Sequence, residues 1–195
     1  MKTMLPANTR MLALTSLFTA MTVIGAQLRV PLPLVPLSMQ DFFVVLSGLI
    51  LGPKYGALSQ ILYLVLGLAG LPIFTKGGGP AYVLQPTFGY LLGFPVASFI
   101  AGKVLQRTGN PTPATWPRLI LACALAVLAL LTLGVFYLWC NTNWIIGAEM
   151  TLWRAIYIGA LVFLPGQVLK ICAAGFLYRA LQPRMGLHLI AQRDA

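Results

Sequence analysis

Residues 119–148 read LILACALAVLALLTLGVFYLWCNTNWIIGA and contain no Asp, Glu, Lys or Arg. About 20 apolar residues in a helix are enough to cross the hydrocarbon core of a bilayer, so this run predicts a membrane-spanning helix. Apolar runs free of the same four residue types also occur at 11–28, 42–53, 55–75, 77–102, 155–169 and 171–178. Because these runs are continuous rather than alternating, they favour helices over the strands of a β-barrel.

The composition excludes several classes of protein. The residues AVILMFWYC make up 59% of the chain and DEKR only 8%, against about 25% charged residues in a typical soluble domain. The mean hydropathy is +0.87. The three cysteines are widely spaced and odd in number, which does not suit the disulfide framework of a small secreted protein. We therefore expect a polytopic, all-α integral membrane protein.

We expect one membrane domain over residues 1–195, built as a bundle of six transmembrane helices. Their approximate ranges are 9–28, 41–52, 54–70, 84–105, 117–139 and 151–182. Three prolines between residues 31 and 36 forbid a regular helix there, so this segment is expected to be an extended loop against the bundle. Gly52-Pro53-Lys54 predicts a turn, and residues 75–80 predict a glycine-rich loop.

Two features are expected inside these helices. Gly89, Gly93, Ala97 and Ala101 recur at every fourth position of the fourth helix, a spacing that lets another helix backbone approach closely in a membrane. We interpret this stripe as packing within the bundle. Pro165-Gly166 is expected near the middle of a long sixth helix.

The positive charges are distributed asymmetrically about the predicted helices. With the N-terminus in the cytoplasm, six spans leave nine Lys and Arg residues inside: Lys2, Arg10, Lys54, Lys103, Arg107, Arg118, Arg179, Arg184 and Arg193. Three lie outside: Arg29, Lys76 and Arg154. Cytoplasmic loops of membrane proteins carry such an excess, so both termini are predicted to be cytoplasmic. The basic residues are scattered singly between apolar runs, so the net charge of +10 does not indicate nucleic-acid binding.

Lys170 is the one basic residue assigned to neither side of the membrane, because it lies inside the last apolar region. An ionisable group within the membrane is costly and usually faces a cavity or a partner. Gln167 lies three residues earlier, on the same helix face, and Pro165 can free a backbone carbonyl nearby. No acid on this helix is available to neutralise Lys170, so we expect a buried cation suited to an anionic ligand. The alternative is that Lys170 extends to the membrane interface.

Other polar groups are candidates for the same site. Ser38 and Gln40 end the proline-rich loop, and glycines 77–79 offer backbone amides. Five aromatic residues supply rings with polar tips: Tyr82, Tyr90, Trp144, Trp153 and Tyr157. These rings could instead form an aromatic belt at the membrane interface, which is their more frequent role.

Motifs for catalysis are missing from the sequence. No G-x-x-x-x-G-K-[ST] motif for a phosphate-binding loop occurs, and the single His188 has no Cys or His cluster beside it for a metal. Asp41 and Glu149 are too far apart in sequence to suggest a pair of catalytic carboxylates. We expect no enzyme activity and no cofactor, so uphill transport would draw its energy from a partner or an ion gradient.

A series of motifs resembles a known family. The sequence contains PLPLVPLSMQ at 31–40, GLILGPKYGA at 48–57, LYLVLGLAGLPIF at 62–74, GGG at 77–79 and PTFGYLLGFP at 86–95. In this order, they resemble the BioY family, the biotin-specific S components of energy-coupling-factor (ECF) transporters. The resemblance covers residues 10–182.

The resemblance implies a six-helix subunit of a prokaryotic cell membrane that captures biotin near the outer face. It also implies a transmembrane coupling subunit and two ATPase subunits as partners. The family's Pro-x-Asp-x-x-Lys pattern for biotin binding reads Pro165-Gly-Gln-Val-Leu-Lys170 here, so Lys170 matches and Gln167 replaces the Asp. The expected substrate contacts are Ser38, Gln40, Gly78, Tyr90, Gln167 and Lys170. Two alternatives stay open: an S component for another small vitamin, and a small integral membrane transferase.

Overall fold

The computed structural model of the chain describes residues 7–31, 35–106 and 114–185. In chain order, its elements are α1 (Ala7–Gln27), β1 (Arg29–Val30), β2 (Leu37–Ser38), α2 (Gln40–Leu68), η1 (Pro80–Leu84), α3 (Phe88–Gln106), α4 (Trp116–Asn141), η2 (Thr142–Ile146), α5 (Leu152–Gly159), η3 (Leu161–Phe163) and α6 (Leu164–Met185). Of the charges used to predict the topology, Lys2, Arg107 and Arg193 lie outside the described residues.

Five of the described helices are long and apolar enough to cross a membrane. They run over Thr9–Gln27, Gln40–Leu68, Phe88–Gln106, Trp116–Ile146 and Leu152–Leu181. Large apolar side chains stay exposed on their outer faces, for example Leu128 at 60% and Leu169 at 73%. A bundle of helices whose outer surface is apolar is what a lipid environment requires, so the structure is that of a multi-pass membrane protein.

The helix α2 folds back on itself at Gly52. This residue has φ 78° and ψ 179°, which lies outside the helical region and suits glycine because it carries no Cβ. The side chains of Gln40 and Tyr63, 23 positions apart, share a hydrogen bond of 2.6 Å, so the two arms of α2 run antiparallel. The predicted turn at Gly52-Pro53-Lys54 is therefore present, and the arms follow the predicted ranges 41–52 and 54–70.

A group of buried polar side chains holds α1, the two arms of α2, and α3 together. We call it the polar seam, and it consists of Thr19, Thr22, Ser47, Ser59, Gln60 and Ser98. Gln60 is central, because its Nε2 donates to Ser47 Oγ at 3.2 Å and its Oε1 accepts from Thr22. Ser47 and Ser98 share a further hydrogen bond at 2.9 Å. Such bonds join helices where lipid offers no hydrophobic driving force between them.

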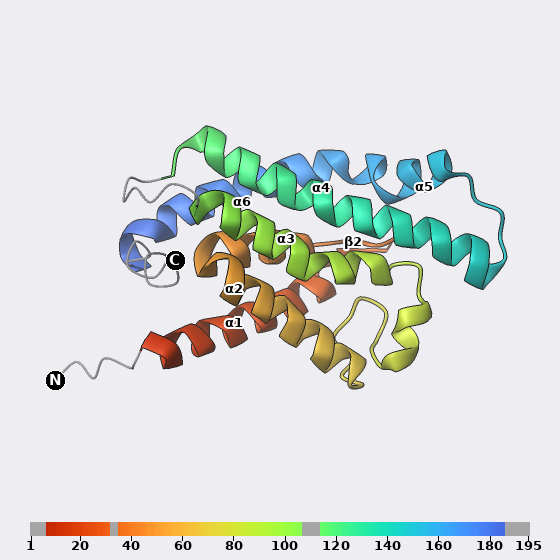
Figure 1. Cartoon of the computed structure of the whole chain (residues 1–195), viewed down its shortest axis with the longest axis horizontal. Helices are drawn as coiled ribbons and strands as arrows, with labels where there is room; N and C mark the ends of the chain where they lie inside the picture. Colours follow the sequence, from red (N-terminus) through yellow and green to blue (C-terminus); the bar gives the residue numbers. More distant parts are fainter. Residues whose placement is uncertain (1–6, 32–34, 107–113, 186–195) are drawn as a thin grey trace.

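The helix α3 packs closely against α4 through Gly89 and Gly93 of its stripe of small residues. All four members of the stripe are buried. A Cβ on Gly89 would lie 2.1 Å from the Cβ of Tyr137, and one on Gly93 would lie 3.2 Å from the Cα of Leu130. Figure 1 shows α3 lying between α2 and α4. The prediction that the stripe serves packing within the bundle is confirmed.

Two predicted boundaries are wrong. The fourth helix was expected from residue 84, but α3 begins at Phe88, because Gln85 precedes a proline and is extended, with ψ 138°. The sixth helix was expected to be continuous over 151–182, but it is broken at Ala160, with φ −133°. Pro165 is the second residue of α6, where a missing N–H breaks no helix bond, so it does not kink the helix.

The residues on either side of the proline-rich segment pair as a short antiparallel hairpin ladder, while residues 32–34 of that segment lie outside the described residues. Arg29 pairs with Ser38, and Val30 pairs with Leu37, in an antiparallel ladder. The strand β2 then leads directly into α2. In Figure 1, α1 begins and α6 ends at the same end of the molecule.

Candidate substrate-binding site

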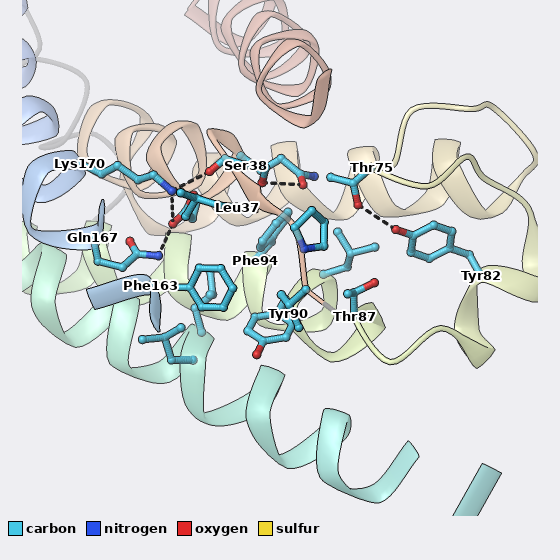
Figure 2. Close-up of a pocket in the computed structure, with 17 residues that line it drawn as sticks. Leu37, Ser38, Thr75, Tyr82, Thr87, Tyr90, Phe94, Phe163, Gln167 and Lys170 are labelled. Atoms are coloured by element: carbon cyan, nitrogen blue, oxygen red, sulfur yellow. Dashed lines mark hydrogen bonds and ion pairs between the residues drawn. The ribbon is translucent and has the colours of Figure 1, made fainter. Parts of the chain in front are cut away.

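A pocket lies where β2, α2, α3, α4 and α6 meet. It contains about 550 Å³ of space not filled by protein atoms, a figure that includes solvent space at its open mouth. Figure 2 shows the lining side chains, which are Val35, Pro36, Leu37, Ser38, Gln40, Asp41, Thr75, Tyr82, Thr87, Tyr90, Leu91, Phe94, Leu130, Leu131, Phe163, Gln167 and Lys170. Polar groups lie at both ends, and aliphatic and aromatic side chains lie between them.

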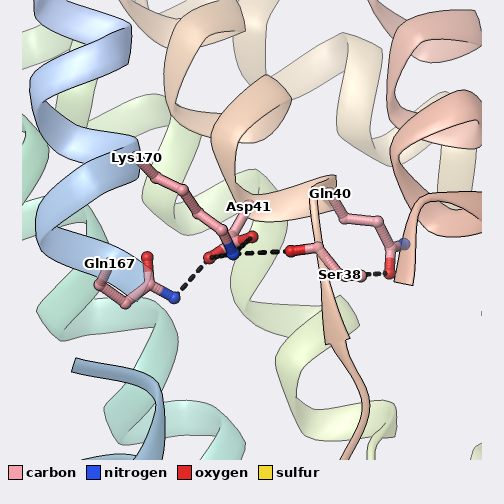
Figure 3. Close-up of polar contacts among 5 residues, drawn as sticks. All are labelled: Ser38, Gln40, Asp41, Gln167 and Lys170. Carbon is pink, nitrogen blue, oxygen red and sulfur yellow. Dashed lines mark hydrogen bonds and ion pairs between the residues drawn. The ribbon is translucent and has the colours of Figure 1, made fainter. Parts of the chain in front are cut away.

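One end of the pocket carries four polar residues that we call the charged cluster: Ser38, Asp41, Gln167 and Lys170. The Lys170 Nζ donates to the Ser38 carbonyl at 2.6 Å and to Oδ1 and Oδ2 of Asp41 at 2.8 and 3.1 Å (Figure 3). Lys170 is only 9% exposed. Its ammonium therefore stays inside the protein, and the alternative in which it extends to the membrane interface is wrong.

The expectation that Lys170 has no carboxylate partner is also wrong. Asp41, in the first turn of α2, forms a buried ion pair with it. The Gln167 side-chain amide donates to the Oδ2 of the same carboxylate. The partner was missed because no acid lies on the helix that carries Lys170, and Asp41 is 129 positions away in the sequence. The feature of the sequence that could have indicated Asp41 is its position as the single acid at the start of an otherwise apolar helix.

Ser38 and Gln40 both line the pocket, as the sequence predicted, but their polar atoms serve the local structure. The Ser38 hydroxyl donates to Gln40 Oε1 at 3.1 Å. Gln40 Nε2 donates to the Tyr63 hydroxyl, which in turn donates to the Ile73 carbonyl at 3.0 Å. These bonds fix β2 and the start of α2 against the loop that follows α2.

The other end of the pocket is lined by hydroxyl groups. Thr75 Oγ1 and the Tyr82 hydroxyl are 3.1 Å apart and share one hydrogen bond. The Thr87 Oγ1 is buried and has no hydrogen-bond partner in the described structure. Tyr90 presents its ring to the pocket, while its hydroxyl donates to the Gly159 carbonyl at 2.7 Å. Figure 2 shows Phe94, Tyr90 and Phe163 between the two ends.

The remaining predicted residues lie away from the pocket. Gly78 is not among the lining residues, and a Cβ on it would lie 2.0 Å from the Leu71 carbonyl oxygen, so close packing accounts for glycine here. Its contact with substrate stays a prediction. Trp144, Trp153 and Tyr157 are exposed, at 77%, 70% and 56%, in the manner of an interfacial belt. Among the described residues, no three His, Cys, Asp or Glu side chains lie together as metal ligands.

The comparison with known families covers nearly the whole chain. The BioY family matches residues 1–186. The chain belongs to the BioY family. A relative named as a probable biotin transporter BioY from Lysinibacillus sphaericus is 42% identical over 136 residues, which cover 70% of this chain and 68% of the relative. The biotin transporter BioY of Rhizobium etli is 31% identical over 182 residues, covering 89% and 93% of the two chains.

A solved structure agrees with this BioY membership. The crystal structure at 2.1 Å of the S component for biotin from an ECF-type ABC transporter matches with a TM-score of 0.83 and 28% identity. The match covers 94% of this chain and 96% of that one. The resemblance drawn from the motif series is thus confirmed. BioY is a family of transporter components, which leaves the transferase alternative without support.

Proposed function

We propose that this BioY-family chain is the biotin-binding S component of an ECF transporter. The observation that carries this proposal is the similarity, along nearly the full length, to the solved S component for biotin. In the proposal, biotin is captured from the outer face into the pocket between the hairpin, α3, α4 and α6. Ser38, Gln40, Tyr90, Gln167 and Lys170 are the proposed contacts, because all five line this pocket.

The chemistry of the pocket suits biotin. Biotin has a polar ureido ring at one end, a carboxylate at the other, and an apolar thioether ring and chain between them. The pocket likewise has polar side chains at its two ends and the rings of Tyr90, Phe94 and Phe163 between them. Ligand sites of this kind combine an apolar lining with a few polar groups that fix orientation.

The proposal includes partners and a cellular location. The sequence contains no phosphate-binding loop, so ATP hydrolysis has to come from other chains. We assign that task to two ATPase subunits and a transmembrane coupling subunit, since the solved relative is described as part of an ECF-type ABC transporter. The location is the cell membrane of a prokaryote.

The proposed topology has six spans with both termini in the cytoplasm. Support comes from the asymmetry of Lys and Arg and from the reversal of α2 at Gly52, which provides two of the six helical segments. The test uses a variant without its three cysteines and with one new cysteine. We expect a membrane-impermeant maleimide to label Leu71→Cys from outside intact cells and to leave Lys103→Cys unlabelled. The reverse pattern would invert the topology.

The binding proposal is tested with the purified chain in detergent. We expect calorimetric titration to show saturable binding of biotin and none of thiamine, a cationic vitamin. Lys170→Ala should weaken biotin binding roughly ten- to a hundredfold, because it removes a pocket-lining side chain and the cation that holds the Asp41 carboxylate in place. Lys103→Ala, at an exposed position near the end of α3, is the matched control and should bind like the wild type. A folded wild-type chain that binds no biotin would refute the proposed function.

A further inference from the structure

We propose that Asp41 is a substrate-selecting residue: through its pair with Lys170, it makes the α6 end of the pocket bind the N–H groups of a neutral cyclic urea instead of a carboxylate. This inference rests on the proposed function and adds which end of biotin lies beside α6. Asp41 lines the pocket and is 8% exposed.

The donors of the charged cluster are already in use. A lysine ammonium has three N–H donors, and Nζ of Lys170 has three oxygen partners, at 2.6, 2.8 and 3.1 Å. Gln167 directs its side-chain nitrogen at Asp41. A ligand carboxylate can only accept hydrogen bonds. It would therefore have to displace the Asp41 carboxylate before it could bind Lys170.

The acceptors of the cluster, in contrast, are not exhausted. A carboxylate offers about four acceptor positions, and Asp41 receives two bonds from Lys170 and one from Gln167. The Gln167 side-chain oxygen points away from Asp41 (Figure 3) and has no partner within the described part of the chain. One acceptor position on Asp41 and this oxygen thus remain for a ligand. The two N–H groups of a cyclic urea are the complementary donors.

The charge of the cluster leads to the same assignment. Asp41 and Lys170 are the charged residues among the described side chains that line the pocket, and their charges cancel. In a low-dielectric site, an isolated cation attracts an anion strongly. A lysine that is paired with a carboxylate at 2.8 Å attracts an anion far less strongly. Without Asp41, the α6 end of the pocket would be a cationic site.

The opposite end has the donors that a carboxylate needs. The Thr87 hydroxyl is buried, is unpartnered in the described structure and lines the pocket. Thr75 and Tyr82 share one hydrogen bond, which uses one of their two hydroxyl protons. Figure 2 shows these three residues on the far side of the Phe94 ring from Lys170. The structure therefore orients biotin with its ureido ring at α6 and its carboxylate at the hydroxyl end.

The test measures how strongly the protein distinguishes biotin from biotin methylated at a ureido nitrogen. Calorimetric titrations use the full chain as wild type, Asp41→Asn, and the exchanged variant Asp41→Asn/Gln167→Asp. The wild type should prefer biotin roughly ten- to a hundredfold, because methylation removes one charge-assisted hydrogen bond. Asp41→Asn should reduce this preference to less than about threefold. The exchanged variant should recover the preference for biotin, because it carries a carboxylate at position 167, which faces position 41.

A variant without either charge covers the case in which Asp41→Asn does not fold. Asp41→Asn/Lys170→Met keeps the charge of the cluster at zero, and its preference for biotin should also be lost. A preference equal to that of the wild type in Asp41→Asn or in this double variant would overturn the role of Asp41. A folded wild type that binds neither compound would instead refute the proposed function itself, so the two failures are distinguishable.

Discussion

The polar seam and three members of the charged cluster, Asp41, Gln167 and Lys170, are buried to a similar degree but have different surroundings. Every residue of the seam is at most 5% exposed, none of them lines the pocket, and each hydrogen-bonds to a neighbouring helix or to its own backbone. Asp41, Gln167 and Lys170 are at most 9% exposed, but they border a cavity and keep unused acceptors. Closed polar networks hold helices together, whereas charged groups beside a cavity indicate a ligand. Substitutions in the two groups should therefore differ in their effects on stability and on ligand binding.

Breaking the ion pair from one side should have the largest effect. Lys170→Ala leaves the Asp41 carboxylate buried without its cation, and such unpaired charges cost about 3–5 kcal/mol of stability. Removing both charges in Asp41→Ala/Lys170→Ala should recover most of that stability while biotin binding remains lost. Thermal unfolding in detergent, followed by size-exclusion chromatography, measures the first effect. If the single and double variants melted alike, the pair would not be a coupled unit.

Forcing the seam apart should come next. A Cβ on Gly48 would lie 2.1 Å from the Ser98 carbonyl oxygen, so Gly48→Ala pushes the first arm of α2 away from α3. Overpacking of this kind costs about 1–3 kcal/mol or more. Ala124→Val adds atoms at an exposed position of α4 and serves as the control. We expect a lower melting temperature for Gly48→Ala alone, and equal melting of the two variants would contradict the close approach.

Removing the central residue of the seam should separate stability from binding. Gln60→Leu deletes the bonds to Ser47, Ser59 and Thr22, which should cost about 1–2 kcal/mol. The partner hydroxyls keep bonds to carbonyls of their own helices, which limits the loss. Biotin affinity should stay within about twofold of the wild type, because Gln60 does not line the pocket. A large change of affinity would mean that the seam belongs to the binding site.

The smallest effect is expected at the hydroxyl end of the pocket. Thr87→Val keeps the shape of a side chain whose hydroxyl has no partner in the described structure. It should leave the melting temperature unchanged or slightly raised, because no protein hydrogen bond is lost. Biotin affinity should fall roughly tenfold, the lower end of the range for a hydrogen bond to a charged group. Titration with biotin amide, which lacks the carboxylate charge, should show a smaller difference between the two proteins.

The sequence was sufficient to predict the helix ranges but not the contacts between side chains of different helices. Continuous apolar runs and glycine or proline breaks determine helix ranges locally, so the two arms of α2 and the ends of α4 agree with expectation within about two residues. The break at Ala160 was missed although Gly159 ends α5 and Pro165 is the second residue of α6, which are positions where glycine and proline are typical of helix ends. The partner of Lys170 could not be found because it depends on how α2 packs against α6, and no spacing along one helix encodes that.

The substitution at position 167 illustrates the same limit. The family pattern predicts an acid on α6 three residues before Lys170, and Gln167 appears at first to leave the lysine unpaired. In the fold, the first turn of α2 supplies the carboxylate, and Gln167 becomes a donor to it. The charge balance of the site is therefore a property of two helices together.

The reversal of α2 at Gly52 also affects how the chain enters the membrane. Its arms contain 12 and 16 residues on either side of the glycine, or roughly 18 and 24 Å of helix. Taken separately, each arm would carry uncompensated glutamine and serine side chains into lipid. Because Gln40 bonds to Tyr63 and Ser47 bonds to Gln60 across the turn, the polar groups of one arm are satisfied by the other. The two arms are thus suited to inserting together as one helical hairpin, with the desolvation of these glutamine and serine side chains partly offset before the neighbouring helices arrive. Asp41 is the exception, because its partners Gln167 and Lys170 lie on α6.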